Sequence, residues 1–450
     1  MTGFALFSGI SPTQTLLGGE TGYVGRDAVV ADLIAGVGNQ IDLRIDGLVV
    51  AGNNAVYLSG TEITLMVGST GQVRSVSAFS EFYPGVRFDV SYGSGAGIGR
   101  LVNAGEISGN VKAVAAYAVD ADDVARISNS GTMVGEVDGV YVGGAGSVVI
   151  SNRGTIEGFV DGITNLWGLD APSNTIVQLT NSGLIRGGDA AIQLGGGADT
   201  VVNLGRLEGD VHLGGGVDLF DGRGGIVLGS VQLEAGNDRF VGNVALAEAV
   251  DGGADKDTLD FRVQGAATVA LDDSFGNAGA ALGDSYAGFE NIMGSRSGND
   301  QLRGDGGANT LQGNGGADEL DGAGGSDFLQ GGTGNDVLTG GSGNDSFAFA
   351  TLTEIGDTIN DFSSIAAGNN DRFVITASAF GGGLVAGALA ANQFQSRADN
   401  VAQDADDRFI FNTSDKTLWF DDDGTGAHTA VLVAHLQASA TMTSLDIVLV

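Results

Sequence analysis

The chain contains no cysteine and only three prolines among its 450 residues. Without cysteine, neither disulfide bonds nor a thiolate metal site can stabilise the fold. The low proline content excludes a collagen-like chain or a stiff proline-rich linker. By contrast, 79 residues are glycine, which is too many for helices and indicates repeated tight turns. These turns are therefore the place to look for another stabilising device.

Basic residues are also scarce. Twenty lysines and arginines oppose 55 acidic residues, which gives a formal net charge of −35. A field of this sign repels nucleic acid and anionic lipid surfaces, so we expect cations as partners and no nucleic acid. No run of 18 apolar residues occurs, and no membrane span is predicted. The first residues have no basic region and only a short apolar run, so a cleaved secretory signal is not expected.

Two common hydrolase signatures are missing. The sequence His-Glu-x-x-His is absent, and the three histidines, His212, His428 and His435, are widely separated, which excludes a zinc protease of that type. No Gly-x-Ser-x-Gly elbow occurs, so a lipase of the usual kind has no support. Hydrolysis by these two routes is therefore set aside.

A nine-residue repeat runs from Gly298 to Phe347. In each unit, a glycine is followed two residues later by an acidic or amide residue and four residues later by an apolar one. The acidic or amide positions are Asp300, Asn309, Asp318, Asp327, Asp336 and Asp345. The turns between them contain Gly313, Gly316, Gly322, Gly325, Gly331, Gly334, Gly340 and Gly343. Glycines allow several carbonyl oxygens to converge, and calcium prefers six to eight oxygen ligands. We therefore predict that these residues bind calcium.

Two nonapeptides make one coil of 18 residues. The turns at Asp300, Asp318 and Asp336 would then stack on one edge, the other three would stack on the opposite edge, and the ions would lie between stacked turns. Coils lie about 4.8 Å apart, so unneutralised aspartates would repel one another by roughly 1 kcal/mol per pair in water and more at lower dielectric. We predict that the array is disordered without calcium and folds cooperatively when calcium binds.

Similar glycine-rich turns recur upstream at about twice the spacing. They end in aspartates 19 or 20 residues apart, which we include as predicted calcium ligands: Asp199, Asp218, Asp238 and Asp257. Further upstream, the pattern Asn-x-Gly recurs at 103, 129, 152, 181 and 203, each time next to a short β-branched run. One strand-bearing coil per repeat is typical of a parallel β-helix.

We predict an all-β fold in which a right-handed parallel β-helix, or β-solenoid, continues into a calcium-binding β-roll with a β-rich C-terminal cap. Residues 1–98 would begin the solenoid, with a separate small β domain as the alternative. The remaining expected segments are the β-helix at 99–261, a connector at 262–293, the roll at 294–347 and the cap at 348–450.

The nonapeptide repeats at residues 294–347 resemble those of the RTX (repeats-in-toxin) proteins, a signature with the form Gly-Gly-x-Gly-x-Asp-x-apolar-x. The resemblance implies calcium-dependent folding outside the cell after export through a type I secretion machinery. Two features depart from the pattern: Asn309 replaces an aspartate, and the first unit, 294–298, lacks the paired glycines. We therefore expect weaker or incomplete sites there.

The tail also resembles the segment that follows the roll in secreted proteases of the serralysin type. The similar stretches include 357–362, 380–382, 406–410 and 418–424. The ending Asp446-Ile-Val-Leu-Val450 is similar to an uncleaved type I export signal and is equally consistent with a last β-strand. A cation site at Asp421, Asp423 and Gly424 is considered, although a solvated acidic turn is favoured there.

We interpret the chain as a secreted, non-catalytic structural or adhesive protein of the cell surface or extracellular matrix. Self-association and binding of extracellular polysaccharide are the partner interactions that we consider. The alternative is a carbohydrate-active enzyme, a lyase, hydrolase or epimerase, because parallel β-helices often host such chemistry. The acidic cluster Asp120, Asp122 and Asp123 is its candidate site, with a solvated loop as the favoured interpretation, and His212 is expected to stack between coils.

Overall fold

The computed structural model describes residues 3–76, 84–90, 96–165, 174–242, 248–365 and 369–450. Strands dominate it, and the only α-helix among these residues is the short α1 (Ala377–Phe380). The chain divides into two compact units. Unit 1 comprises the described residues up to 242 together with 248–255, and unit 2 comprises the described residues from 256 to 450.

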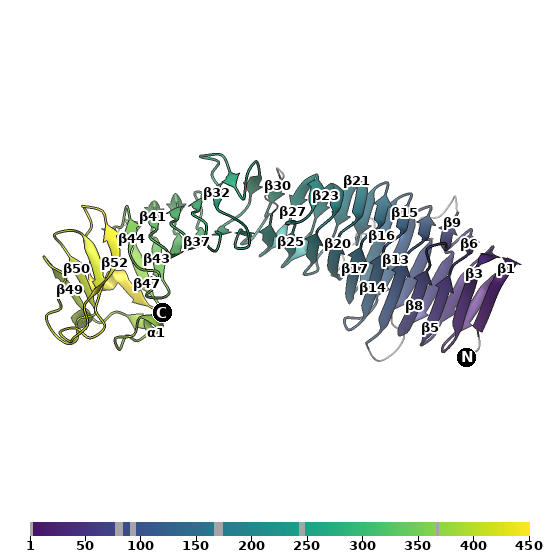
Figure 1. The fold of residues 1–450 in the computed structure, drawn as a ribbon, viewed down its shortest axis with the longest axis horizontal. Helices are drawn as coiled ribbons and strands as arrows, with labels where there is room; N and C mark the ends of the chain where they lie inside the picture. Colours follow the sequence, from purple (N-terminus) through teal and green to yellow (C-terminus); the bar gives the residue numbers. More distant parts are fainter. Residues whose placement is uncertain (1–2, 77–83, 91–95, 166–173, 243–247, 366–368) are drawn as a thin grey trace. The chain divides into compact units, whose positions relative to one another are not determined.

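Unit 1 is a solenoid whose coils contribute strands to three parallel sheets (Figure 1). The first sheet stacks β1 (Gly3–Ser11), β3 (Thr21–Val30), β5 (Ile41–Ile45), β8 (Glu62–Val67), β11 (Ile98–Asn103), β14 (Val124–Asn129), β17 (Ser147–Asn152), β20 (Ile176–Asn181), β22 (Thr200–Asn203), β25 (Leu219–Asp221) and β29 (Arg239–Val241). The second contains the end of β3 and then β6 (Leu48–Ala51), β9 (Gln72–Ser75), β12 (Glu106–Gly109), β15 (Thr132–Gly135), β18 (Thr155–Gly158), parts of β21 (Leu184–Gln193) and β23 (Arg206–His212), and β26 (Ile226–Leu228).

The third sheet of unit 1 completes each coil. Its members are β2 (Gln14–Leu17), β4 (Ile34–Val37), β7 (Val56–Gly60), β10 (Val86–Val90), β13 (Lys112–Ala118), β16 (Asp138–Gly144), β19 (Asp161–Thr164), the second halves of β21 and β23, β27 (Ser230–Gln232) and β30 (Ala249–Asp251). The strands before residue 91 thus stack in the same sheets as those after it.

Alternating side chains explain why these segments form strands. In β5, for example, every second residue is buried, so apolar side chains face the interior and polar ones face solvent. Parallel pairing in register then places like residues above one another. One interior row of the first sheet consists of Leu43, Leu65, Leu101, Ile127, Ile150, Leu179, Val201, Phe220 and Phe240, all at most 2% exposed.

The Asn-x-Gly asparagines form a buried ladder at the turn between the first two sheets. The Nδ2 atom of each donates to the Oδ1 atom of the next, from Asn103 through Asn129, Asn152 and Asn181 to Asn203, at 2.8–2.9 Å. The same Oδ1 atoms accept from the peptide N–H of the following glycine at 129, 152 and 181. An amide has both a donor and an acceptor, so the stack satisfies its own hydrogen bonds.

We predict that Asn152→Ala destabilises unit 1 by about 2–4 kcal/mol, because it removes one hydrogen-bond partner of the buried Asn129 donor and one of the buried Asn181 acceptor. Urea denaturation followed by circular dichroism measures the change. The exposed Asn53→Ala variant is the control and should change stability little. Equal midpoints for the two variants would contradict a stabilising ladder.

Unit 2 is a roll of two sheets that are parallel in the repeat region, and the second continues through antiparallel strands toward the C-terminus (Figure 1). The first stacks β31 (Thr258–Asp260), β35 (Asn291–Met293), β37 (Thr310–Gly315), β40 (Phe328–Thr333), β43 (Ser346–Phe349), β47 (Arg372–Ile375) and β53 (Ile447–Leu449). The second stacks β32 (Ala267–Ala270), β36 (Gln301–Arg303), β38 (Glu319–Asp321), β41 (Val337–Thr339), β44 (Asp357–Ile359) and β52 (Val431–Leu436), and β51 (Thr417–Phe420), β50 (Phe409–Asn412) and β49 (Phe394–Arg397) extend it.

The sequence-based prediction of an all-β parallel solenoid is confirmed. The segment expected to be a connector, 262–293, contains strands that belong to the roll, because β32 pairs with β36 and β35 pairs with β37. Because residues 262–293 do not follow the sequence repeats on either side of them, the sequence did not reveal this pairing. The C-terminal residues 447–449 form a strand whose Ile447 pairs with Phe373.

Candidate metal centre

Carboxylates connect successive coils of the roll. On one edge, the peptide N–H of Asp300 donates to Asp318 Oδ1, and the N–H of Asp318 donates to Asp336 Oδ1, both at 2.8 Å. On the other edge, Asn309 N–H donates to Asp327 Oδ1 and Asp327 N–H to Asp345 Oδ1, at 2.8 and 2.9 Å. The two stacks expected from the nine-residue spacing are therefore present as hydrogen-bonded ladders.

The ladder uses only the Oδ1 atom of each aspartate, and the second carboxylate oxygen, Oδ2, takes no part in it. The Oδ2 atoms are buried and have no hydrogen-bond partner among the described residues in four cases, Asp318, Asp327, Asp336 and Asp345. These residues are at most 2% exposed. A buried carboxylate oxygen without a partner is costly unless a proton or a cation compensates its charge. Each of these turns thus has an unmet requirement for positive charge.

The glycines at the start of each turn make room for that oxygen. A β-carbon placed on Gly313 would lie 2.3 Å from Asp318 Oδ2 and 2.5 Å from the carbonyl oxygen of Gly331 in the next coil. The same holds for Gly322, with Asp327 Oδ2 at 2.4 Å and the Gly340 oxygen at 2.6 Å. These distances exclude a side chain at either glycine. Beside each glycine, a carboxylate oxygen and a carbonyl oxygen of the next coil therefore lie close to each other. Oxygen donors of this kind suit calcium.

The fourth residue of each turn must also be glycine. Gly316, Gly325, Gly334 and Gly343 have φ between 125° and 143°, which L side chains rarely adopt. A β-carbon at Gly334 would lie 1.5 Å from the Gly316 carbonyl oxygen, so the two backbones approach closely. Gly331 and Gly340 lie against Asp336 Oδ2 and Asp345 Oδ2 in the same way as Gly313 does against Asp318. All eight glycines predicted from the sequence therefore adjoin a carboxylate or a neighbouring turn.

Burial raises the pKa values of these aspartates. The pKa of Asp318 and that of Asp327 rise to about 7, mainly because burial disfavours the charged form. Neighbouring carboxylates add to the rise, whereas the backbone N–H donors oppose it. Burial also raises the pKa values of Asp300, Asp336 and Asp345. In the absence of metal, the turns therefore take up protons readily.

The first member of each ladder differs from the rest. Asp300 Oδ2 accepts from the N–H and the hydroxyl of Ser295, at 2.7 and 3.1 Å, so both of its oxygens have partners. Asn309 Oδ1 accepts from Asp305 N–H at 2.9 Å. At both positions where the sequence departs from the repeat, hydrogen-bond donors of the protein therefore reach the side-chain oxygen of the ladder residue.

Two aspartates beyond the repeat continue the ladders and were not predicted from the sequence. Asp336 N–H donates to Asp357 Oδ1 and Asp345 N–H to Asp371 Oδ1, both at 3.0 Å. Burial raises the pKa of Asp357 to about 8 and that of Asp371 to about 6. Their distances from the preceding ladder residue, 21 and 26 residues, break the period of 18 and so concealed them.

A shorter carboxylate ladder lies in unit 1. Val177 N–H donates to Asp199 Oδ1, Asp199 N–H to Asp218 Oδ1 and Asp218 N–H to Asp238 Oδ1, at 2.6–2.7 Å. Burial raises the pKa of Asp199 to about 8 and that of Asp218 to about 7. The fourth predicted residue, Asp257, is buried in unit 2, where its N–H donates to Glu290 Oε2.

The turns of this ladder lack the first glycine. The residues five positions before Asp199, Asp218 and Asp238 are buried leucines, namely Leu194, Leu213 and Leu233. The unit 1 aspartates therefore form the same kind of hydrogen-bonded ladder as the roll aspartates. A leucine stands where the roll has the glycine that lies against the carboxylate. Asp199 Oδ2 and Asp218 Oδ2 are nevertheless buried without a hydrogen-bond partner among the described residues.

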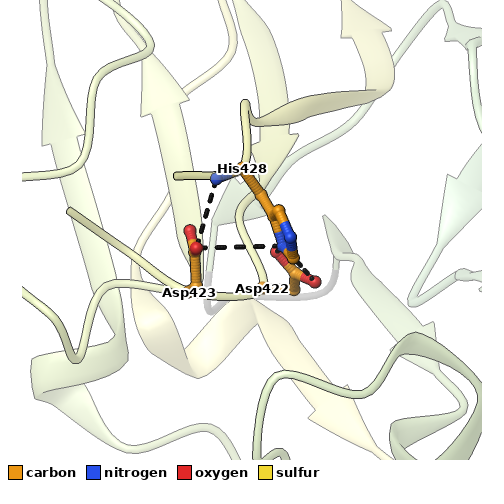
Figure 2. A group of neighbouring side chains, drawn as sticks. All are labelled: Asp422, Asp423 and His428. Carbon is orange, nitrogen blue, oxygen red and sulfur yellow. Dashed lines mark hydrogen bonds and ion pairs between the residues drawn. The ribbon is translucent and has the colours of Figure 1, made fainter. Parts of the chain in front are cut away.

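The acidic turn near the C-terminus brings together Asp422, Asp423 and His428 (Figure 2). His428 Nδ1 lies 2.9 Å from Asp422 Oδ1, and Asp423 Oδ2 accepts from His428 N–H at 3.1 Å. The Asp422 carboxylate raises the pKa of His428. Asp421 Oδ1 accepts from the N–H groups of Asp423 and Gly424, so it stabilises the turn.

The acidic cluster considered for catalysis is also a turn. Asp123 is buried, and its two oxygens accept from Gly97 N–H and Asp120 N–H, at 2.7 and 2.8 Å. His212 lies on β23 in register with Gln193 and Gln232 of adjacent coils, and its Nδ1 lies 3.2 Å from Glu234 Oε1.

A family model for the RTX calcium-binding nonapeptide repeat, in four copies, matches residues 295–329 and 321–349. Residues 295–349 are RTX calcium-binding repeats. The match covers the nonapeptide turns of the roll, and calcium is the ion that such repeats bind. The chain has no match among curated proteins over its sequence. None of the helices in its described part has the length and hydrophobicity needed to cross a membrane.

We predict that protons can replace calcium in part in stabilising the folded roll. The folded-state pKa values of Asp318 and Asp327, about 7, exceed the ordinary value of 3.8. Protonation therefore stabilises the calcium-free roll below about pH 4, and this stabilisation is lost as the pH rises through about 7. The calcium concentration at half-folding should therefore decrease as the pH falls from about 8 to about 6. Calcium titrations followed by circular dichroism test this, and the signal at saturating calcium should not depend on pH. A half-folding concentration that stays constant over this range would contradict the prediction.

Proposed function

We propose that this protein is a secreted, non-catalytic component of the cell surface or surrounding matrix. Its roll folds when calcium binds after the chain has left the cell through a type I secretion machinery. The calcium ligands that we propose are the aspartates and glycines of the roll turns, with the unit 1 ladder as a further candidate. The stacked coils of unit 1, which offer repeated surfaces for contact with other molecules, support the structural role.

The single observation that supports this proposal is the unpartnered Oδ2 atom of four successive roll aspartates. Four buried carboxylates in one small roll oppose folding unless cations neutralise them. A cation that binds only the folded roll stabilises it by mass action, so folding depends on the calcium concentration. Calcium is scarce inside cells and abundant outside them, and a roll of this kind would therefore remain unfolded until export.

Replacement of one ladder aspartate tests the assignment of ligands. In the full chain, Asp318→Asn should raise the calcium concentration at half-folding roughly tenfold or more, since a charged ligand is lost. Glu319→Gln is the matched control, because Glu319 lies one residue away and is exposed. Calcium titrations followed by circular dichroism give both values. If the two variants shift the midpoint equally, Asp318 is not a ligand.

A second candidate function, a carbohydrate-active enzyme, is favoured by one cluster on unit 1. Lys112 Nζ lies 3.1 Å from Asp138 Oδ2, and each side chain is 9% exposed. Asp161 is in register with Asp138 on the next strand. Burial raises the pKa of Asp161 to about 6, and Asp138 and Asp189 add to the rise. One carboxylate with a lysine partner and one with a raised pKa meet the needs of paired base and acid chemistry.

Incubation with uronate-containing polysaccharides tests this alternative. An enzyme of the lyase type would produce unsaturated products that absorb near 235 nm, and Asp161→Asn should abolish them. Asp27→Asn is the control, since Asp27 is an exposed residue of β3 that belongs to neither candidate cluster. Reducing-end release is measured in parallel to detect hydrolysis. Absence of both signals across neutral and acidic polysaccharides favours the non-catalytic function.

A further inference from the structure

The first coil of unit 1 has an unpaired edge. Within the described residues, β1 pairs only with β3, and β2 pairs only with β4. One side of each strand therefore presents peptide N–H and C=O groups that no neighbouring strand uses. Such an edge is a template for pairing with another chain, and proteins usually protect it with charged side chains or proline.

This coil has little of that protection, because its one proline, Pro12, lies between β1 and β2 and outside both strands. No charged residue precedes Glu20 in the sequence, although charged residues make up 17% of the chain. The coil exposes apolar side chains instead: Phe7 is 71% exposed, Ile10 80% and Leu17 63%. Phe7 and Ile10 lie on β1, and Leu17 ends β2. The uncharged composition and the apolar surface thus coincide with the unpaired edge.

We propose that this edge binds the same edge of a second copy of the chain. The charge distribution favours this partner. Two molecules that each have a formal charge of −35 repel one another, and a face without acidic groups lets them approach with the least repulsion. The partner must also supply a strand of similar length with its own unused hydrogen-bonding groups, and β1, with nine residues, supplies both.

Pairing of identical edges sets the geometry. If the contact is two-fold symmetric, β1 of one molecule runs antiparallel to β1 of the other, and β2 lies beside its counterpart. Each surface then contacts its own copy, so the assembly closes as a dimer and does not grow into a fibre. Backbone hydrogen bonds and the burial of Phe7 and Ile10 stabilise it.

The inference does not depend on the proposed function. Its residues all belong to unit 1, whereas the four open roll aspartates belong to unit 2. The dimer should therefore persist when a chelator removes calcium. The two proposals can therefore fail separately. If the roll fails to respond to calcium while the dimer remains, only the calcium assignment is wrong.

Sedimentation velocity on the full chain tests the proposal. We expect a dimer at micromolar concentrations, with and without chelator. The double variant Phe7→Glu/Ile10→Glu should weaken dimerisation roughly 100-fold or more, because like charges then meet across the contact. Both side chains are mostly exposed, so the variant should fold. Phe159→Glu is the matched control, with 80% exposure in unit 1, and should leave the dimer unchanged. A wild-type monomer at high concentration would overturn the proposal.

Spin labels distinguish edge pairing from other self-association. The chain has no cysteine, so a single Ser8→Cys substitution places one label on each molecule. The two labels should lie within roughly 20 Å of each other, since paired strands are about 4.8 Å apart. A label at Phe159→Cys serves as the control and should show no such short distance. A dimer in which the Ser8→Cys labels are far apart would exclude pairing through β1.

Discussion

The hydrogen bond from an aspartate peptide N–H to the carboxylate of the next coil is the interaction on which the roll depends. It fixes the stacking of turns, and it uses one of the two carboxylate oxygens. Because an ionised carboxylate only accepts hydrogen bonds, the remaining oxygen needs a donor or a cation. Serine supplies a donor to Asp300, whereas Oδ2 of the four following aspartates has no donor within the described part of the chain. The requirement for added positive charge therefore begins only after the first turns.

The chain shows two solutions to the stacking of polar residues in a solenoid, and unit 1 contains both. In unit 1, asparagine amides hydrogen-bond to one another, and the ladder is neutral and complete without any ion. In the roll, aspartates occupy comparable turns, and the ladder is incomplete without positive charge. The asparagine ladder thus uses a side-chain donor and a side-chain acceptor at each step, whereas the aspartate ladder uses a peptide N–H donor and leaves one carboxylate oxygen over.

The regular parts of this molecule could be predicted from the sequence because their physical causes are local and periodic. A nine-residue repeat places Asp318 above Asp300, and glycines with positive φ mark the turns. Asp357 and Asp371 could not be predicted in this way, because insertions of different length precede them and only pairing in three dimensions returns them to the ladder. The strands within 262–293 were concealed for the same reason. The leucines at 194, 213 and 233 were visible in the sequence, but their effect depends on how closely the first turn residue approaches the carboxylate.

The strand at the C-terminal end has a consequence for the order in which the roll can be completed. Ile447 and Leu449 are buried, and β53 pairs with β47, which in turn pairs with the last strand of the repeat, β43. The first sheet of the roll therefore takes its strand after β47 from a segment that lies beyond residues 376–446. Pairing across so long a stretch of chain costs more loop-closure entropy than pairing between successive nonapeptide coils, so it is slower than the stacking of the repeats. Folding of this sheet thus finishes at β53 rather than at the repeat turns.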